Sequence, residues 1–231
     1  MEEAALRAGR SPDGVRLMAV TKTVEIPRIL EAMEAGATLL GENRVQELAA
    51  KREQVPQCLP CAAHLEMHLI GHLQSNKAAK APACADMIQS VDSVRIAREI
   101  SNACVRLGKT MPVLLEVNIG RDAAKFGFMP AQTGEALDEI MLLPGILVRG
   151  LMTVPPICDD PARTQNFFYQ MHRLWVDICA KKMDNIVKDK LGAPSMDVLS
   201  MGMSDDFELA IAEGSTLIRV GSAIFGGRMS R

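Results

Sequence analysis

The stretch Arg16-Leu17-Met18-Ala19-Val20-Thr21 is a short apolar run that ends at a single lysine, Lys22. Seven further runs rich in Val, Ile, Leu and Met follow it along the chain. They lie at residues 37–41, 67–71, 87–91, 113–118, 147–152, 196–200 and 217–220. Runs without a polar face are typical of parallel strands that helices cover on both sides of the sheet. The sequence therefore predicts eight parallel strands.

Helices are predicted in the gaps between these runs, near residues 24–35, 43–54, 73–80, 93–107, 130–142, 161–190 and 204–213. In the first of them, Ile26, Ile29, Leu30 and Met33 fall on one face of a helix. Eight strands with a helix in each gap predict an α/β fold, a single (β/α)8 TIM barrel domain over residues 1–231. An open doubly wound sheet is the alternative, but no G-x-G-x-x-G motif follows the first run.

Composition and charge narrow the class of protein. The chain has 231 residues, 48% of them apolar, and 26 basic against 28 acidic residues give a net charge of -2. This balance argues against nucleic acid or an anionic membrane as a partner. No apolar run is long enough to cross a bilayer, and acidic residues near Met1 do not fit a signal peptide. Six dispersed cysteines fit reduced thiols, so we expect a cytoplasmic protein.

In a TIM barrel, function is located at the C-terminal ends of the strands. The seventh and eighth runs are each followed by a glycine and a hydroxyl residue, Gly202 with Ser204 and Gly221 with Ser222. A helix that starts at such a turn offers free backbone N–H groups and a favourable dipole to a phosphate. The two turns together predict a phosphate site, although Ser204 alone is equally consistent with an ordinary helix N-cap.

Lys22 would stand at the mouth of the same barrel. Partial desolvation there favours the neutral amine, which is the nucleophile for a carbonyl group. An amine that faces a phosphate site suits an aldehyde that carries a phosphate, and pyridoxal 5'-phosphate (PLP) has both groups. Arg219, at the end of the eighth run, is placed to contact the pyridine nitrogen of PLP. A surface lysine at a loop entrance remains the alternative for Lys22.

Several segments, in order along nearly the whole chain, closely resemble the YggS/PROSC family of PLP homeostasis proteins. They are Ala19-Val20-Thr21-Lys22, Gly41-Glu42-Asn43-Arg44-Val45-Gln46-Glu47, His68-Leu69-Ile70-Gly71-His72-Leu73-Gln74-Ser75-Asn76-Lys77, Gly150-Leu151-Met152, Ser200-Met201-Gly202-Met203-Ser204-Asp205-Asp206-Phe207 and Arg219-Val220-Gly221-Ser222-Ala223-Ile224-Phe225-Gly226. The chain departs from the family pattern at Phe126, where serine is more frequent, and at Ser222, where threonine is common.

The resemblance implies a barrel of the alanine racemase N-terminal type and PLP held as a Schiff base on Lys22. It further implies a protein that buffers or delivers PLP, with apo PLP-dependent enzymes as possible recipients and a monomer or weak dimer as the assembly. The implied cofactor-binding residues are Lys22, Asn43 and Met152 at the ring, Arg219 at the pyridine nitrogen, and Ser204, Gly221 and Ser222 around the phosphate.

Arg219 also bears on reactivity. An arginine stays protonated and only donates, so it leaves the pyridine nitrogen unprotonated and the ring a poorer electron sink. Racemisation needs a second acid or base besides Lys22, and the one tyrosine, Tyr169, lies in a predicted helix away from the strand ends. We therefore expect little or no catalysis and no catalytic residue. A fold-type III amino-acid racemase is one alternative, and a phosphosugar enzyme without PLP, with Glu42 as its base, is another.

The segment Cys58-Leu59-Pro60-Cys61 is a C-x-x-C motif with His64 and His68 nearby. No second C-x-x-C supports zinc, and no strand-to-helix junction places Cys58 as a thioredoxin-like thiol. We expect no metal site there. The sequence alone leaves open whether His68 points into the barrel or out of it.

Overall fold

The structure is a computed structural model, and it describes residues 1–58, 65–182 and 196–227, without the side chains of residues 56–58 and 182. Its strands are β1 (Arg16–Val20), β2 (Leu39–Glu42), β3 (Glu66–Leu69), β4 (Met87–Val91), β5 (Met111–Glu116), β6 (Ile146–Met152), β7 (Val198–Ser200) and β8 (Leu217–Val220). Each strand pairs in parallel with the next, and β8 returns to β1 to close the barrel. The predicted (β/α)8 barrel is confirmed.

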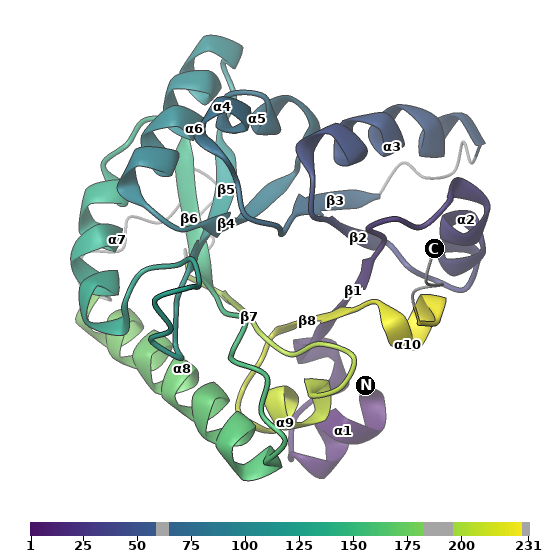
Figure 1. Ribbon diagram of the computed structural model, residues 1–231, viewed down its shortest axis with the longest axis vertical. Helices are drawn as coiled ribbons and strands as arrows, with labels where there is room; N and C mark the ends of the chain where they lie inside the picture. Colours follow the sequence, from purple (N-terminus) through teal and green to yellow (C-terminus); the bar gives the residue numbers. More distant parts are fainter. Residues whose placement is uncertain (59–64, 183–195, 228–231) are drawn as a thin grey trace.

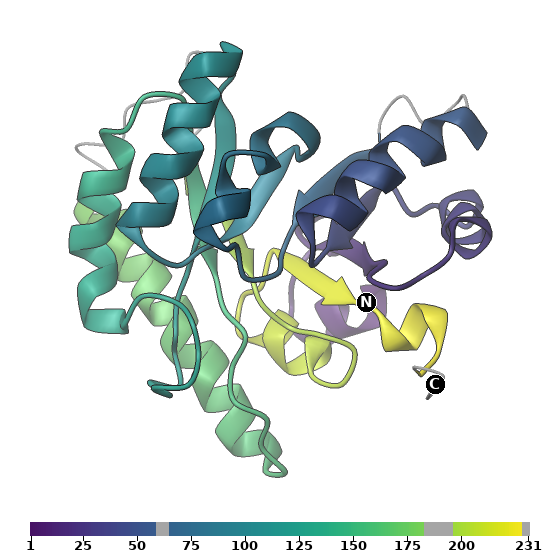
Figure 2. The ribbon, with the colours of Figure 1, turned by 45° about the horizontal axis from the view of Figure 1, so that its top comes forward.

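Helices surround the strands on the outside of the barrel (Figures 1 and 2). They are α1 (Glu2–Arg7), α2 (Ile26–Glu34), α3 (Val45–Cys58), α4 (Ser75–Ala78), α5 (Ala81–Cys84), α6 (Val94–Leu107), α7 (Thr133–Met141), α8 (Pro161–Lys182), α9 (Phe207–Ala212) and α10 (Ser222–Phe225), with 3-10 turns η1 (Pro12–Gly14) and η2 (Pro130–Gln132). Local sequence explains the ends of α6, where the Ser93 hydroxyl accepts from the N–H of Ile96 and Gly108 adopts φ 61°.

Three details differ from the sequence predictions. The helix predicted near residues 73–80 is two short helices, α4 and α5, and Pro82 stands in the first turn of the second, where a proline is tolerated. The loop predicted from Gln54 begins later, because α3 continues to Cys58 with Pro56 in its last turns. Helix α10 follows Gly221, where a helix start was expected from the turn, although no helical range was predicted there. The predicted end of the helix over 161–190 lies beyond the described residues.

The buried apolar residues form two layers, one inside the barrel and one between strands and helices. Side chains alternate along a strand, so residues two apart share a face. Those of the inner layer are Met18, Leu39, Met87, Leu114, Met152, Val198 and Leu217. Their neighbours in sequence pack outward against helices, as Leu40 does beside Ile29 of α2. By the same alternation His68, Gln89, Ser200 and Arg219 point inward, above the inner apolar layer.

Within the described part of the chain, none of the helices has the length and apolar character needed to span a bilayer.

Candidate functional site

The predicted site residues all lie at the C-terminal mouth of the barrel. Lys22 follows β1, Asn43 follows β2, and Met152 is the last residue of β6. Ser204 lies between β7 and α9, while Arg219 is in β8 and is followed by Gly221 and Ser222 at the start of α10. Since β7, β8 and β1 are neighbours in the barrel, the fold brings the predicted phosphate residues next to the strand that carries Lys22.

The turn that carries Lys22 is held from behind by α3. Thr23 adopts φ 61°, a left-handed conformation that is unusual for a β-branched residue. Its N–H donates to Oε1 of Glu47 at 2.6 Å, and the N–H of Val24 donates to the carbonyl oxygen of Thr21 at 2.9 Å. These two hydrogen bonds stabilise a strained backbone directly after Lys22. The backbone that carries the half-buried Lys22 is thereby held at the mouth.

A buried ion cluster supports the same turn. Nζ of Lys51 on α3 contacts Oε1 of Glu42 at 2.7 Å, Oε1 of Glu47 at 2.8 Å and the carbonyl oxygen of Thr21 at 2.6 Å. Burial raises the pKa of Glu42, while the hydrogen bonds from Lys51 and Thr21 oppose that rise. Gly41 faces the barrel interior, so Glu42 faces outward to α3. A carboxylate on that side of the wall is badly placed to act as the base of a phosphosugar enzyme.

Ser204 differs from the ordinary N-cap that the sequence also allowed. Helix α9 begins at Phe207, and its N-cap residue is Asp206 rather than Ser204. Instead, the Ser204 hydroxyl accepts from the N–H of Gly221 at 3.2 Å and from the N–H of Ala223 at 3.3 Å. The loop after β7 is thus joined to the start of α10, as the prediction of a shared site for the two turns requires. Two backbone N–H groups converge here on one acceptor oxygen.

Gly202 allows the loop after β7 to reach this position. Its φ is +95°, and a Cβ at this residue would lie 2.6 Å from Cβ of Ala210. Only glycine accommodates both conditions. The carbonyl oxygen of Gly202 also accepts from the N–H of Arg219 at 2.9 Å, which continues the pairing of β7 with β8 past the end of β7.

Arg219 is the charged group at the centre of the mouth, and it is only 4% exposed. Its Nη1 donates to the Ser200 hydroxyl at 2.7 Å, and its Nη2 donates to the carbonyl oxygen of Thr153 at 2.8 Å. Burial lowers the pKa of Arg219 to about 10, with Asp206 and Glu116 acting in the opposite direction. The guanidinium is therefore still charged at neutral pH, and it can only donate.

Glu116 is a carboxyl group that the sequence reasoning missed. It ends β5 and points inward, since Leu114 two residues earlier belongs to the inner layer. Burial, and secondarily the charge of Asp92, raise its pKa to about 7, although Arg219 and Lys125 lower it. Its Oε2 atom is buried without a hydrogen-bond partner among the described residues. A glutamate at the end of an apolar strand was the available signal.

Two cavities open on another part of the mouth. One, of about 520 Å³, is lined by residues after β3, β4 and β5 and includes His72, whose ring stacks on Phe126 at 3.5 Å between centroids. The other, of about 450 Å³, includes Asn43 and Arg44 after β2. Of the predicted residues, Asn43 lines the second cavity, whereas the others lie around β1, β6, β7 and β8. The backbone N–H donors that converge on one oxygen lie at β7 and β8, away from these cavities.

The structure also gives the positions of Tyr169 and His68, two residues considered in the sequence analysis. Tyr169 lies on α8 and is 48% exposed, away from the strand ends as expected. His68 points into the barrel, which settles the orientation that the sequence left open. The side chain of Cys58 and all of Cys61 lie outside the described residues, so the C-x-x-C motif stays a sequence observation.

The family model of the alanine racemase N-terminal domain matches residues 4–229. The chain belongs to this family. A pyridoxal phosphate homeostasis protein of Pasteurella multocida is 37% identical over 229 residues, covering 99% of this chain and 93% of its own. Another, from Escherichia coli K12, is 36% identical over 225 residues, covering 97% and 91%. The resemblance seen in the sequence motifs is confirmed.

Solved structures of family members have the same fold. PipY of Synechococcus elongatus PCC7942, with PLP bound, has a TM-score of 0.81 at 37% identity and covers 97% of this chain and 98% of PipY. A protein of Bifidobacterium adolescentis has a TM-score of 0.86 at 41% identity, with coverages of 96% and 89%. Alanine racemase of Clostridium difficile 630 reaches 0.67 at 15% identity over 99% of this chain and 56% of its own, which shows a shared barrel fold alone.

Proposed function

We propose that the protein binds PLP at the mouth of its barrel through a Schiff base on Lys22, and buffers or delivers it within the cell. The name shared by the curated relatives and the PLP bound in PipY support the cofactor. The observation on this chain that carries the proposal is the convergence of Ser204 and the N–H groups of Gly221 and Ala223 beside Arg219 and β1.

The chemistry of these residues fits PLP. A phosphate would replace the Ser204 hydroxyl as the acceptor of the N–H groups of Gly221 and Ala223, with Ser204, Gly221 and Ser222 around it. Arg219 presents a donor to a ring nitrogen, while Asn43 and Met152 would line the ring. Bound PLP would supply an aldehyde that reacts reversibly with the Lys22 amine. Hydrogen bonds of Glu47 and Lys51 with the residues on either side of Lys22 hold the backbone that carries this amine.

A role without significant catalysis follows from the permanent positive charge of Arg219 beside the pyridine nitrogen. A guanidinium that is already bound to Ser200 and Thr153 and stays charged cannot take up a proton and does not protonate the pyridine nitrogen. The ring is then a weak electron sink. The curated relatives are named as homeostasis proteins, which agrees with a carrier role.

The test is the visible absorption of purified protein with added PLP, before and after borohydride reduction. We expect a yellow band in the wild type that borohydride removes, with PLP then attached to the Lys22 peptide. Lys22→Ala removes the band, whereas Lys77→Ala, which changes another lysine at the mouth, keeps it. A band that persists in Lys22→Ala, or PLP attached to another lysine, contradicts the proposal.

A fold-type III racemase is the second candidate, and Glu116 is the observation that favours it. A carboxyl group with a pKa of about 7 that faces the mouth is an acid or base of suitable strength. If this candidate holds, purified protein with PLP interconverts the enantiomers of alanine or serine, and Glu116→Gln abolishes that turnover while PLP remains bound. Absence of turnover in the wild type removes the candidate.

A further inference from the structure

A chain of polar side chains runs through the barrel interior beneath Arg219. The Ser200 hydroxyl, which accepts from Arg219, donates to Oε1 of Gln89 on β4 at 2.7 Å. Nε2 of Gln89 lies 3.0 Å from Nδ1 of His68 on β3. Ser200 and Gln89 are fully buried, and His68 is 1% exposed. Buried polar side chains need hydrogen-bond partners, and these residues supply them to one another.

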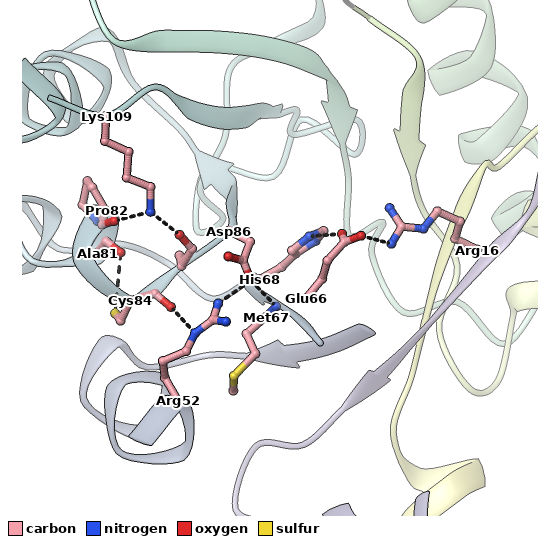
Figure 3. Close-up of polar contacts among 11 residues, drawn as sticks. Arg16, Arg52, Glu66, Met67, His68, Ala81, Pro82, Cys84, Asp86 and Lys109 are labelled. Carbon is pink, nitrogen blue, oxygen red and sulfur yellow. Dashed lines mark hydrogen bonds and ion pairs between the residues drawn. The ribbon is translucent and has the colours of Figure 1, made fainter. Parts of the chain in front are cut away.

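The lower end of this hydrogen-bond chain lies at the opposite end of the barrel from Lys22. Nε2 of His68 lies 3.2 Å from Oε2 of Glu66, and Oε1 of Glu66 lies 2.9 Å from Nη2 of Arg16 on β1. Figure 3 shows this end, with the His68 ring directed at Glu66 and Glu66 directed at Arg16. The hydrogen bonds thus cross the barrel from β8 to β1 through β7, β4 and β3.

The chemistry of the two ends sets one direction for every hydrogen bond. Arg219 can only donate, so Ser200 accepts from it and directs its own proton to Oε1 of Gln89. The Gln89 amide then presents its N–H to His68, whose Nδ1 must carry a lone pair. The proton of His68 is therefore on Nε2, where it is donated to Glu66, an ionised carboxylate that can only accept. If His68 were protonated on Nδ1, the Gln89 amide would have to turn over, and the Ser200 proton would lose its acceptor.

The charges around His68 agree with a neutral ring. Burial lowers its pKa, and the hydrogen bond to Glu66 opposes this less strongly. Glu66 itself has its pKa lowered to about 2, first by the hydrogen bond from His68 and further by Arg16. Two further charged groups act on the pKa of His68: Arg16, which lowers it, and Asp86, which raises it. Asp86 precedes β4 and is paired with Arg52 (Figure 3).

We propose that Gln89 and Ser200 are positioning residues for PLP: they hold the Arg219 guanidinium in place through a hydrogen-bond chain whose direction requires the Nε2–H tautomer of His68. This inference rests on the proposed function for its link to PLP, while the hydrogen-bond chain is made by the protein's own side chains. A side chain that is held before binding loses less conformational freedom when the ligand arrives. Arg219 would therefore meet the pyridine nitrogen already oriented, although neither Gln89 nor Ser200 is among the residues proposed to contact PLP.

The first experiment uses the full chain without PLP. Imidazole ¹⁵N spectra at neutral pH, with the His68 signals identified by their loss in His68→Asn, report the tautomer directly. We expect an unprotonated Nδ1 and a protonated Nε2. We also expect resolved Nη–H signals for Arg219 in the wild type, which merge in Ser200→Ala and in Gln89→Leu because the guanidinium then rotates. An Nδ1–H tautomer, an imidazolium, or Nη–H signals unchanged in both variants overturns the proposal.

The second experiment measures the affinity for PLP by absorption titration. We expect Ser200→Ala and Gln89→Leu each to weaken binding about three- to tenfold, the range for one side chain that must be ordered on binding. Because both variants break the same hydrogen-bond chain, the double variant should bind PLP no more weakly than the weaker single variant. Met87→Leu, an apolar change in the inner layer of the same strand, should leave affinity within about twofold.

A merely structural role would give a different pattern. The double variant would then lose affinity by the product of the two single effects, or the losses would follow the melting temperature with Met87→Leu included. Either result overturns the proposal. If the wild type binds no PLP at all, the proposed function fails by itself, and the tautomer and the Arg219 signals still decide whether the chain positions the guanidinium.

Discussion

Replacement of Glu116 by glutamine should make the protein more stable at high pH. In the folded protein the pKa of Glu116 is raised to about 7 from its ordinary value of 4.5, mainly by burial. Below pH 4.5 the carboxyl is neutral in both the folded and the unfolded chain, so it costs nothing. Between pH 4.5 and 7 the carboxyl is ionised in the unfolded chain but still protonated in the folded one, so the free energy of unfolding falls; above 7 the folded state carries a poorly solvated charge and the full loss is reached.

The size of the effect follows from the shift. The difference between 7 and 4.5 is 2.5 pKa units, which corresponds to about 3.4 kcal/mol at about 1.36 kcal/mol per unit. Because the side chain is not fully buried, solvent screening reduces this, and we expect about 2–3 kcal/mol. Glutamine has the same shape and carries no charge, so Glu116→Gln avoids the penalty.

Urea unfolding of PLP-free wild type and Glu116→Gln at pH 5, 6, 7, 8 and 9 measures the effect. The free energy of unfolding of the variant minus that of the wild type should grow between pH 5 and 7 and change little between pH 8 and 9. Glu53→Gln, at an exposed carboxylate on α3, is the control and should differ from the wild type by less than about 0.5 kcal/mol at every pH. A difference for Glu116→Gln that does not change with pH refutes the argument.

Two further changes test the supports of the mouth. Lys51→Met leaves Glu42 buried without its cation, so urea unfolding at pH 7 should show a fall of about 3–5 kcal/mol in the free energy of unfolding. Most of this stability should return in the double variant Lys51→Met with Glu42→Leu. A fall below about 1 kcal/mol contradicts a buried pair. Gly202→Ala forces a left-handed backbone and a clash with Ala210, so the melting temperature should fall by at least about 2 °C. An unchanged melting temperature would show that the loop after β7 has room to move.

Much of the fold could be predicted from local sequence, because each strand is a short apolar run and each gap has helical period. The eight runs correspond to β1–β8, with ends that differ by a few residues. The errors arose where local pattern is weak. Pro82 could not show by itself that α4 ends and α5 begins, and α10 is only one turn long, which is too short for periodicity to reveal.

The candidate site was predicted less completely. The residues after each strand could be identified because a parallel barrel places all its strand ends at one mouth. The role of Ser204 could not, since its hydroxyl accepts from N–H groups 17 and 19 residues away rather than from its own helix. Glu116 escaped notice because its raised pKa depends on burial and on Asp92, which is distant in sequence.

By itself, the sequence determined that the chain forms a parallel barrel and that small and polar residues follow its strands, because strand burial and turn chemistry are local properties. The tertiary structure decided which of those groups meet. It placed Glu42 outside the barrel wall against Lys51, and it aligned Gln89 and Ser200 beneath Arg219. Hydrogen-bond partners on different strands depend on the register and closure of the sheet, which no single stretch of sequence encodes.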